Sequence, residues 1–250
     1  MQNTLKLCLF SVAFAPVCVL AADFSAGVAT AISQTVYKQH KTYVTPFPSL
    51  NYRGDRFFIE GKTAGVHIVK ADQWTVSALI DVDFSQFDPD DSKNASFRQL
   101  DERKIGLLGG VKINYALSRN DVFSLSFLAD ISDHHQSVIP VLSWRHSYAF
   151  SDRTTRYFSF AEARFNSHKY NQYYYGVSRN ESARSGVASY SPGAKAELSL
   201  GVGLSHSLTP TISVTALLGG RWIGNNLTDS PIIKRSIAAN GFVGVSYRFE

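Results

Sequence analysis

The sequence has only two cysteines, and both lie at its start. Cys8 and Cys18 fall within an apolar stretch that follows a basic residue and ends at the small residues Ala21 and Ala22. This pattern is typical of a secretory signal peptide over residues 1–22, and we expect cleavage after Ala21 or Ala22. The chain that follows then has no cysteine, which excludes disulfides, thiolate metal sites and cysteine nucleophiles.

A second long apolar run is also missing. No later stretch is long and apolar enough to form a membrane-spanning helix, so a multi-pass helical protein is excluded. Charged residues make up only 18% of the chain, and the basic ones are scattered although the formal net charge is +5. A nucleic-acid surface would gather them, so we expect no nucleic-acid partner. At this length, residues 23–250 are expected to form a single domain.

The sequence does contain a two-residue period that recurs from segment to segment. Apolar residues alternate with polar or small ones because successive side chains in a strand point to opposite faces. The clearest apolar faces run through residues 24–32, 74–84, 105–115, 123–131, 196–204 and 212–222. Together with 17 Phe and 12 Tyr, which suit interfacial girdles, these strands predict an all-β fold, a transmembrane antiparallel β-barrel.

The connections between the strands alternate in length. Short turns are expected near residues 53–55, 71–73, 117–121, 150–154 and 208–211, and longer polar loops at residues 34–42, 87–103, 168–195 and 225–235. Single-chain barrels have short periplasmic turns and longer extracellular loops. Twelve strands keep all long loops on one side if a hairpin reverses near Gly61 and Lys62; ten strands are the fallback. Pro46 and Pro48 cannot donate to a ladder, so they predict a bulge or weakened pairing in the second strand.

The last strand, residues 236–249, has one face that is apolar and ends in aromatic residues. A C-terminal strand of this kind resembles the signal by which barrel assembly machinery recognises its clients. Tyr247 and Phe249 are therefore the predicted assembly signal, and that machinery and outer-membrane lipid are predicted partners. Glu250 departs from the pattern because it follows the aromatic residue that would usually be last.

The longest loop, residues 168–195, contains a helix signal. Ser178 and Glu181 fit a capping box and Gly186 fits a helix stop, which predicts a short helix over residues 179–185. The tyrosines that precede it are expected to form the outer aromatic girdle. The alternative is a ligand or partner surface, for which the candidates are Tyr173, Tyr174, Tyr175, Arg179 and Arg184.

The faces predicted to line the lumen carry charges of both signs. The candidates are Asp81, Asp83, Lys112, Glu197, Arg221 and Arg248. Charges held away from bulk water tend to pair, whereas a strongly selective channel would show a ring of one sign. The mixture predicts an internally braced barrel or a weakly selective pore. Small residues such as Gly201 and Gly203 leave room for a narrow conduit.

One group of residues is a weak candidate for catalysis or metal binding. His134 and His135, with Asp130 and Asp133, are expected at the outer end of a hairpin. They offer a metal site or a base with its orienting group. Adjacent side chains of a strand point to opposite faces, however, so we favour a solvated loop tip. Since no nucleophile elbow and no glycine-rich phosphate loop occurs, we expect no catalytic residue, no cofactor and no metal.

Several different short motifs follow one another along nearly the whole exported chain. They are Pro46-Phe47-Pro48, residues 52–58, Leu100-Asp101-Glu102-Arg103, Tyr174-Tyr175-Gly176-Val177, residues 182–186 with Tyr190, Asp229-Ser230-Pro231-Ile232 and Val245-Ser246-Tyr247-Arg248-Phe249. In this order and spacing they resemble the outer-membrane MltA-interacting protein (MipA)/OmpV family. The resemblance implies a β-barrel in the outer membrane of a Gram-negative bacterium.

The resemblance also implies a role. The family's namesake is described as a scaffold that joins a lytic transglycosylase to a bifunctional penicillin-binding protein. We therefore expect a non-enzymatic scaffold in peptidoglycan biosynthesis at the cell envelope. Two alternatives stay open: a small porin-like channel, which the polar lumen supports, and a surface-exposed adhesin or antigen. An enzyme at the outer rim would rest on His134 and His135 alone.

Overall fold

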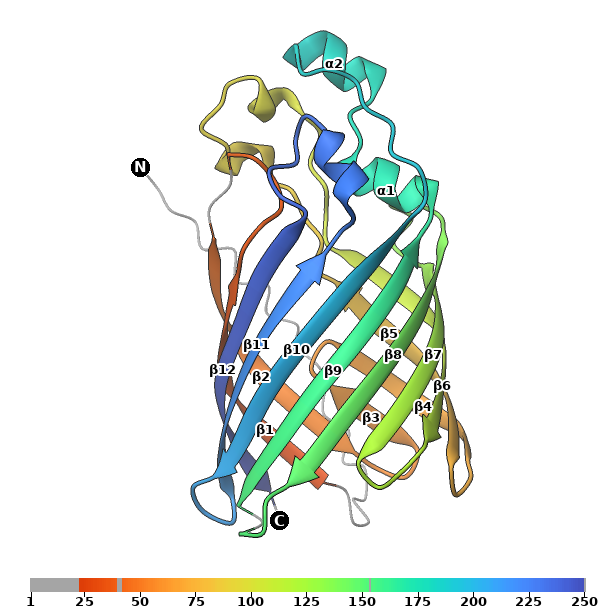
Figure 1. Ribbon diagram of the computed structural model, residues 1–250, viewed down its shortest axis with the longest axis vertical. Helices are drawn as coiled ribbons and strands as arrows, with labels where there is room; N and C mark the ends of the chain where they lie inside the picture. Colours follow the sequence, from red (N-terminus) through yellow and green to blue (C-terminus); the bar gives the residue numbers. More distant parts are fainter. Residues whose placement is uncertain (1–22, 40–41, 153, 250) are drawn as a thin grey trace, which may run out of the picture.

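The computed structural model describes residues 23–39, 42–152 and 154–249. The predicted signal peptide and Glu250 lie outside the described residues, so what is expected of them stays a prediction. Twelve antiparallel strands close into a barrel in sequence order (Figure 1). They are β1 (Asp23–Ser33), β2 (Tyr43–Arg53), β3 (Phe57–Glu60), β4 (Thr63–Lys70), β5 (Trp74–Asp83), β6 (Gly106–Ala116), β7 (Asp121–Asp130), β8 (Val138–Ala149), β9 (Thr155–Asn166), β10 (Lys195–Ser207), β11 (Ile212–Trp222) and β12 (Ile237–Phe249). The predicted barrel and its twelve strands are confirmed.

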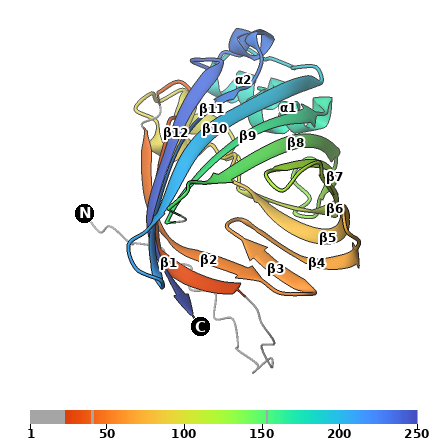
Figure 2. The ribbon, with the colours of Figure 1, turned by 60° about the horizontal axis from the view of Figure 1, so that its bottom comes forward.

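The hairpin that decides the strand count reverses at the predicted place. Gly61 and Lys62 join β3 to β4, and Gly61 has a φ of 59°, a left-handed conformation that glycine adopts without a side-chain clash. The long connections consequently lie at one end of the barrel, and the short turns after β2, β4, β6, β8 and β10 lie at the other (Figure 1). In single-chain barrels the long loops are extracellular and the short turns are periplasmic. The end with the long loops is therefore termed the outer mouth, and the opposite end is termed the periplasmic end. In Figure 2, which brings the periplasmic end forward, the strands ring the lumen.

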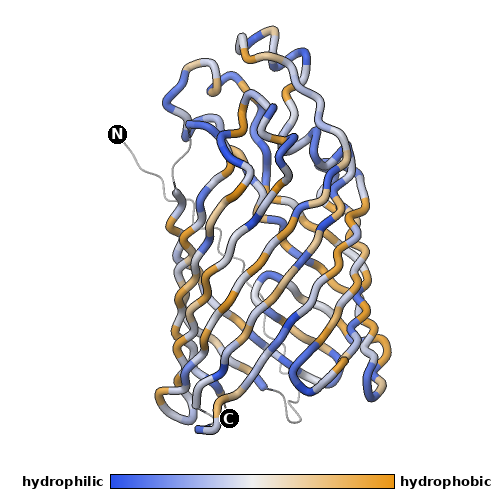
Figure 3. Tube along the Cα trace, viewed as in Figure 1, coloured by the Kyte–Doolittle hydropathy of each residue, from blue (hydrophilic) through white to orange (hydrophobic). Residues whose placement is uncertain are grey.

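Side chains alternate across the wall as a membrane barrel requires. Outward apolar residues are exposed, reaching 71% for Val28 and 70% for Leu218, whereas inward Ser77 and Ser126 are buried. The alternation of apolar and polar positions is visible along the strands in Figure 3. In the described part of the chain, no helix is long and apolar enough to cross a membrane. The strands themselves present an apolar surface to lipid and a more polar one to the lumen.

One strand departs from regular pairing. β2 pairs with β1 along its whole length without a register shift. On its other side it pairs with β3 only through Asn51, Tyr52 and Arg53. Pro46 and Pro48 lie in the stretch that lacks this second partner. The prolines predicted a bulge or weakened pairing. Weakened pairing is confirmed on the β3 side of β2, and the ladder between β1 and β2 has no bulge.

The apolar core gathers in the loops of the outer mouth rather than halfway along the barrel. In the described ranges these loops carry the 3₁₀ helices η1 (Pro89–Asp91), η2 (Phe97–Gln99) and η3 (Asn225–Asp229) and the α-helices α1 (His168–Tyr175) and α2 (Arg179–Ser185). The fully buried side chains there include Val36, Phe87, Tyr170, Tyr174, Tyr175, Val177, Ile223, Leu227, Ile232 and Ile233. α2 has the predicted limits, with the Ser178 capping box and a left-handed Gly186 at its end.

Candidate functional site

α1 closes the outer mouth. It begins just after β9, where the Ser167 hydroxyl accepts a hydrogen bond from the Tyr170 amide at 3.1 Å. Tyr170, Tyr174 and Tyr175 are at most 1% exposed, and the rings of Tyr170 and Tyr174 lie 4.7 Å apart. Burial raises the pKa of all three phenols, so they remain protonated hydrogen-bond donors.

Three other loops hold α1 in place. The Tyr37 hydroxyl, from the loop between β1 and β2, donates to the Tyr174 carbonyl at 2.9 Å. The Tyr37 ring also meets Phe87 of the β5–β6 loop edge-on at 5.1 Å. From the β11–β12 loop, the Ser230 hydroxyl donates to the Tyr175 carbonyl at 2.7 Å. The plug is defined as α1 together with Tyr37 and Phe87.

The plug corrects the prediction for the loop tyrosines. Tyr174 and Tyr175 were expected in an outer girdle or on a partner surface, but both are buried in the mouth. A tyrosine fits such a site when its ring is packed and its hydroxyl finds a partner, as here. Tyr173 is partly buried against the same cluster. Arg179 and Arg184 are exposed on α2, so a role for them at a surface stays a prediction.

Buried charges lie directly beneath the plug. Asp83, at the end of β5, accepts hydrogen bonds from the Arg164 guanidinium at 2.8 Å and from the Tyr170 hydroxyl at 3.0 Å. The Arg164 guanidinium also lies 5.5 Å from the centre of the Tyr170 ring, a cation–π contact. Both charges are therefore compensated by partners on β5, β9 and α1, which ties the plug to the wall.

A second charged group supports the other end of α1. Glu197 of β10 lies 3.6 Å from the Arg221 guanidinium of β11. Its carboxylate also accepts hydrogen bonds from Asn166 at 3.3 Å and from the Tyr175 hydroxyl at 3.5 Å. Three predicted lumen charges, those of Asp83, Glu197 and Arg221, thus brace the plug rather than line an open passage.

Another buried ion pair fixes α2 above the plug. Arg103, in the β5–β6 loop, donates to Glu181 at 2.6 Å, and both side chains are at most 5% exposed. The Glu181 carboxylate also accepts hydrogen bonds from the Asp101 amide at 3.0 Å and the Ser178 amide at 2.8 Å. Burial opposes ionisation of Glu181, but the Ser178 amide and the Arg103 guanidinium outweigh it and hold its pKa below the usual value. On the solvent side, Arg184 pairs with Asp101.

The sequence pattern did not reveal this ion pair. In the sequence, Arg103 is part of a motif that resembles one in a known family, and Glu181 is predicted to cap a helix. Neither observation predicts that the two side chains pair. The two residues are far apart in the chain, and no local period connects them. A capping glutamate in a long loop is the one signal that pointed near the site.

The two histidines are held apart by the plug. His134 stacks on Tyr173 at 5.3 Å, whereas buried His135 meets the Tyr170 ring edge-on at 5.0 Å. The prediction of a solvated loop tip is therefore wrong for His135, which is buried. This burial lowers the pKa of the imidazole. Its Nδ1 lies 2.8 Å from the Ser137 hydroxyl, and its buried Nε2 has no hydrogen-bond partner in the described chain, so no nucleophile for it to activate lies within reach. No cluster of three metal-ligating side chains occurs among the described residues.

Below the plug the lumen is polar. A cavity of about 580 Å³ reaches from Asp72, in a periplasmic turn, to Arg164 beneath the plug. Asp81 and Lys112 both line it, and Asp81 accepts a hydrogen bond from Lys62 at 2.6 Å. Since acidic and basic groups share the wall, this cavity favours neither sign of solute.

Aromatic rings cover two glycines that were expected to leave space in the lumen. Gly201 and Gly203 of β10 face Phe160 and Phe158 of β9 across the ladder. A Cβ atom at either glycine would lie 2.3 Å from the facing ring. Neighbouring aromatic rings therefore fill the space directly over these two glycines, and a narrow conduit through the lumen stays a prediction.

The remaining candidate residues lie at the periplasmic end. Arg248 pairs with Asp23 at 3.3 Å, and both side chains are more than half exposed. Phe249 stacks on Phe24 of β1 at 5.1 Å, where the barrel closes. The assembly role of Tyr247 and Phe249 stays a prediction.

Several known proteins are similar to this chain. A family model described as "MltA-interacting protein MipA" matches residues 26–249. The MltA-interacting protein of Escherichia coli (strain K12) is 28% identical over 229 residues, 90% of each chain. A second protein of that strain, named "Putative outer membrane protein YiaT", is 26% identical over 92% of each chain. Among solved structures, an outer membrane channel from Pseudomonas putida F1 aligns over 93% of this chain and 97% of its own with a TM-score of 0.47 and 10% identity.

Proposed function

Because this chain belongs to the MltA-interacting protein MipA family, we propose that it is a scaffold that docks a lytic transglycosylase at the periplasmic end of its barrel. The chain is an outer-membrane β-barrel, and its family and fold are those of a non-enzymatic barrel. The name of its E. coli relative supports a murein hydrolase of the MltA kind as the partner. A bifunctional penicillin-binding protein would be the second enzyme that the scaffold joins.

The closed outer mouth is the observation that carries this proposal. Three buried tyrosines of α1 fill the mouth. The ion pairs Arg164–Asp83 and Arg103–Glu181 fix α1 and α2 to the strands and loops around them. A barrel closed on the outside cannot act as an open pore, whereas its periplasmic end stays available to proteins of the murein layer.

The periplasmic turns supply a docking surface of mixed charge. Arg56, Asp72, Arg119 and Asp152 are exposed on four different turns. The strands hold these turns in fixed relative positions, so a partner meets a defined charge pattern. Such patterns set the orientation and the rate of association more than the affinity.

Binding of a purified lytic transglycosylase to the folded barrel tests the proposal. We expect saturable binding that becomes about tenfold weaker when Arg56→Glu and Arg119→Glu are combined, since both reverse a charge in the pattern that the partner meets at the periplasmic end. The matched control combines Arg179→Glu and Arg184→Glu, which change the same charge at the outer mouth. Absence of saturable binding, or an equal loss in both double variants, would contradict docking at the periplasmic end.

A small channel is the second candidate function. The polar cavity of about 580 Å³ beneath the plug favours it. A channel would need the plug to leave the mouth, because α1 stands between this cavity and the outside. Stable conductance of the intact barrel would favour this second function over the scaffold.

A further inference from the structure

The barrel wall has an unpaired strand edge. β2 extends over 11 residues, yet only the last three pair with β3. Within the described residues, positions 43–50 of β2 have no strand partner on this side, although β1 covers the other side. Barrels normally close to remove such edges, because lipid cannot satisfy free backbone groups. An edge of this length in the membrane wall therefore calls for a specific cause.

The two prolines of β2 lie at the positions that the free edge requires. The Gly54 amide donates to the Phe57 carbonyl at 2.9 Å, so Gly54 directs its backbone groups towards β3. Alternate residues of a strand direct their backbone groups to the same side. Pro46 and Pro48 therefore sit at edge-facing positions, and each lacks the amide hydrogen that would have no acceptor there. Two costly unpaired donors are thereby absent from the edge.

The same prolines argue against a peptide as the occupant of the edge. A partner strand that added to β2 would find no donors at Pro46 and Pro48, and prolines at edges are a known protection against strand addition. The outward side chains along the edge are apolar, with Val44 and Leu50 both exposed. An apolar chain suits this edge better than a backbone that needs hydrogen bonds.

The edge borders a framed opening. Below it lies the Gly61–Lys62 turn of the short β3–β4 hairpin. Above it, the β5–β6 loop reaches the top of β2, where the Tyr43 hydroxyl donates to Asp91 at 3.1 Å. Thr45 faces the lumen by strand parity and is nevertheless exposed. The lateral window is defined by residues 43–50 of β2, this turn and this loop.

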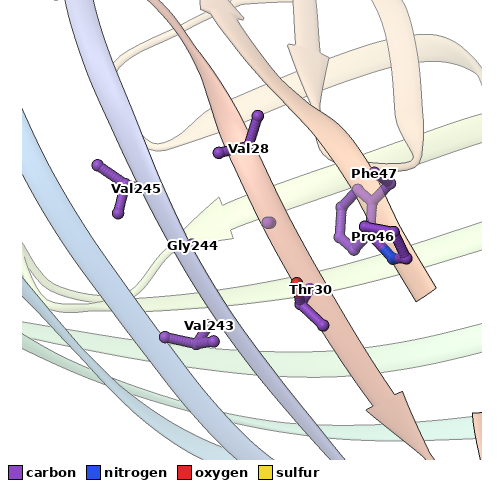
Figure 4. Close-up of a pocket in the computed structure, with 8 residues that line it drawn as sticks. Val28, Thr30, Pro46, Phe47, Val243, Gly244 and Val245 are labelled. Carbon is purple, nitrogen blue, oxygen red and sulfur yellow. The ribbon is translucent and has the colours of Figure 1, made fainter. Parts of the chain in front are cut away.

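Aromatic rings lie on the lumen side next to the lateral window, and charged groups lie below it. The Phe47 and Phe242 rings lie 5.9 Å apart on the lumen side of β2 and β12. On the lipid-facing side of the same three strands, a pocket of about 510 Å³ is lined by Val28, Thr30, Pro46, Val243 and Val245, among others (Figure 4). The charged cavity beneath the plug begins at the hairpin below the lateral window, with Lys62 beside Asp81.

We propose that a phospholipid inserts an acyl chain through the lateral window and lays it against Phe47 and Phe242. The window lies in the membrane wall, so lipid is what surrounds it. Its edge is apolar, and the Phe47 and Phe242 rings lie on its lumen side. This lipid site is independent of docking at the periplasmic end.

Contact quenching tests the site in the intact exported chain. Residues 23–250 contain no cysteine, so a single introduced cysteine can carry a bimane fluorophore in phosphatidylethanolamine vesicles. Brominated acyl chains in these vesicles quench only a fluorophore that they touch. We expect a label at Thr45→Cys to be quenched nearly as strongly as one at lipid-facing Val28→Cys. A label at Ser199→Cys, which faces the lumen from the fully paired β10, is expected to keep its fluorescence.

Quenching at Thr45→Cys no stronger than at Ser199→Cys would overturn the proposal. Ser49→Cys faces the lumen at the same edge and provides a second position if Thr45→Cys does not fold. The altered gel mobility of heated barrels shows which variants are folded. The periplasmic charge variants, Arg56→Glu with Arg119→Glu, are expected to leave quenching unchanged, which separates this test from the test of docking.

Discussion

Glu181→Gln tests whether a buried ion pair holds the outermost loop on the plug. The substitution keeps the shape of the side chain but removes the charge that compensates Arg103, whose guanidinium is 2.6 Å away and buried. Loss of one partner of a buried pair costs about 3–5 kcal/mol. Glutamine still accepts a hydrogen bond, so we expect the lower value, about 3 kcal/mol, which multiplies the population of the open loop by roughly 100.

Hydrogen exchange of the α2 amides measures this opening directly. We expect exchange in α2 to accelerate by roughly 100-fold, while β9 and β10 stay protected, because only the loop opens. Arg184→Gln is the matched control, since its pair with Asp101 is exposed and is worth at most about 1 kcal/mol. Similar acceleration in both variants, or none in Glu181→Gln, would refute the reasoning.

Three further outcomes follow from the same contacts. Acid should loosen α2: because the pKa of Glu181 is lowered, its contribution is complete above its ordinary pKa of about 4.5 and is lost as the pH falls through the folded value. The protection of the α2 amides relative to their intrinsic exchange rates should then depend on pH in this range in the native chain but not in Glu181→Gln. Tyr170→Phe removes the hydroxyl that donates at 3.0 Å to a buried carboxylate and should lower the stability to urea by about 1–3 kcal/mol; an unchanged midpoint would count against the brace. Gly201→Ala should cost about 1–3 kcal/mol because its Cβ would overlap the Phe160 ring, while Gly193→Ala, in open space, should cost little; equal costs would contradict the packing.

The features that could be predicted from sequence have local signals. Strand positions follow from alternation along a few residues, and the hairpin at Gly61 follows from the need to keep the long loops on one side. α2 was predictable because the Ser178 cap, Glu181 and the Gly186 stop all lie within nine consecutive positions. Weakened pairing at Pro46 followed from the missing amide hydrogen.

The plug could not be predicted because its stability comes from distant segments. Tyr170 and Tyr174 are buried by side chains from four loops, so α1 has no one-sided apolar pattern of the usual amphipathic kind. Tyrosine also suits a membrane interface, which made the girdle an equally natural interpretation. The Phe160 ring packs over Gly201 only because of the register between β9 and β10. Closure of the whole barrel sets that register, and no single strand reveals it.

Single-channel conductance of the refolded exported chain tests the central claim that the plug seals the barrel. We expect no stable steps in the intact chain. When residues 168–194 are replaced by a short linker, stable steps should appear, because the cavity of about 580 Å³ then opens to the outside. Stable steps in the intact chain, unchanged in size by the deletion, would contradict a sealed mouth and favour the channel over the scaffold.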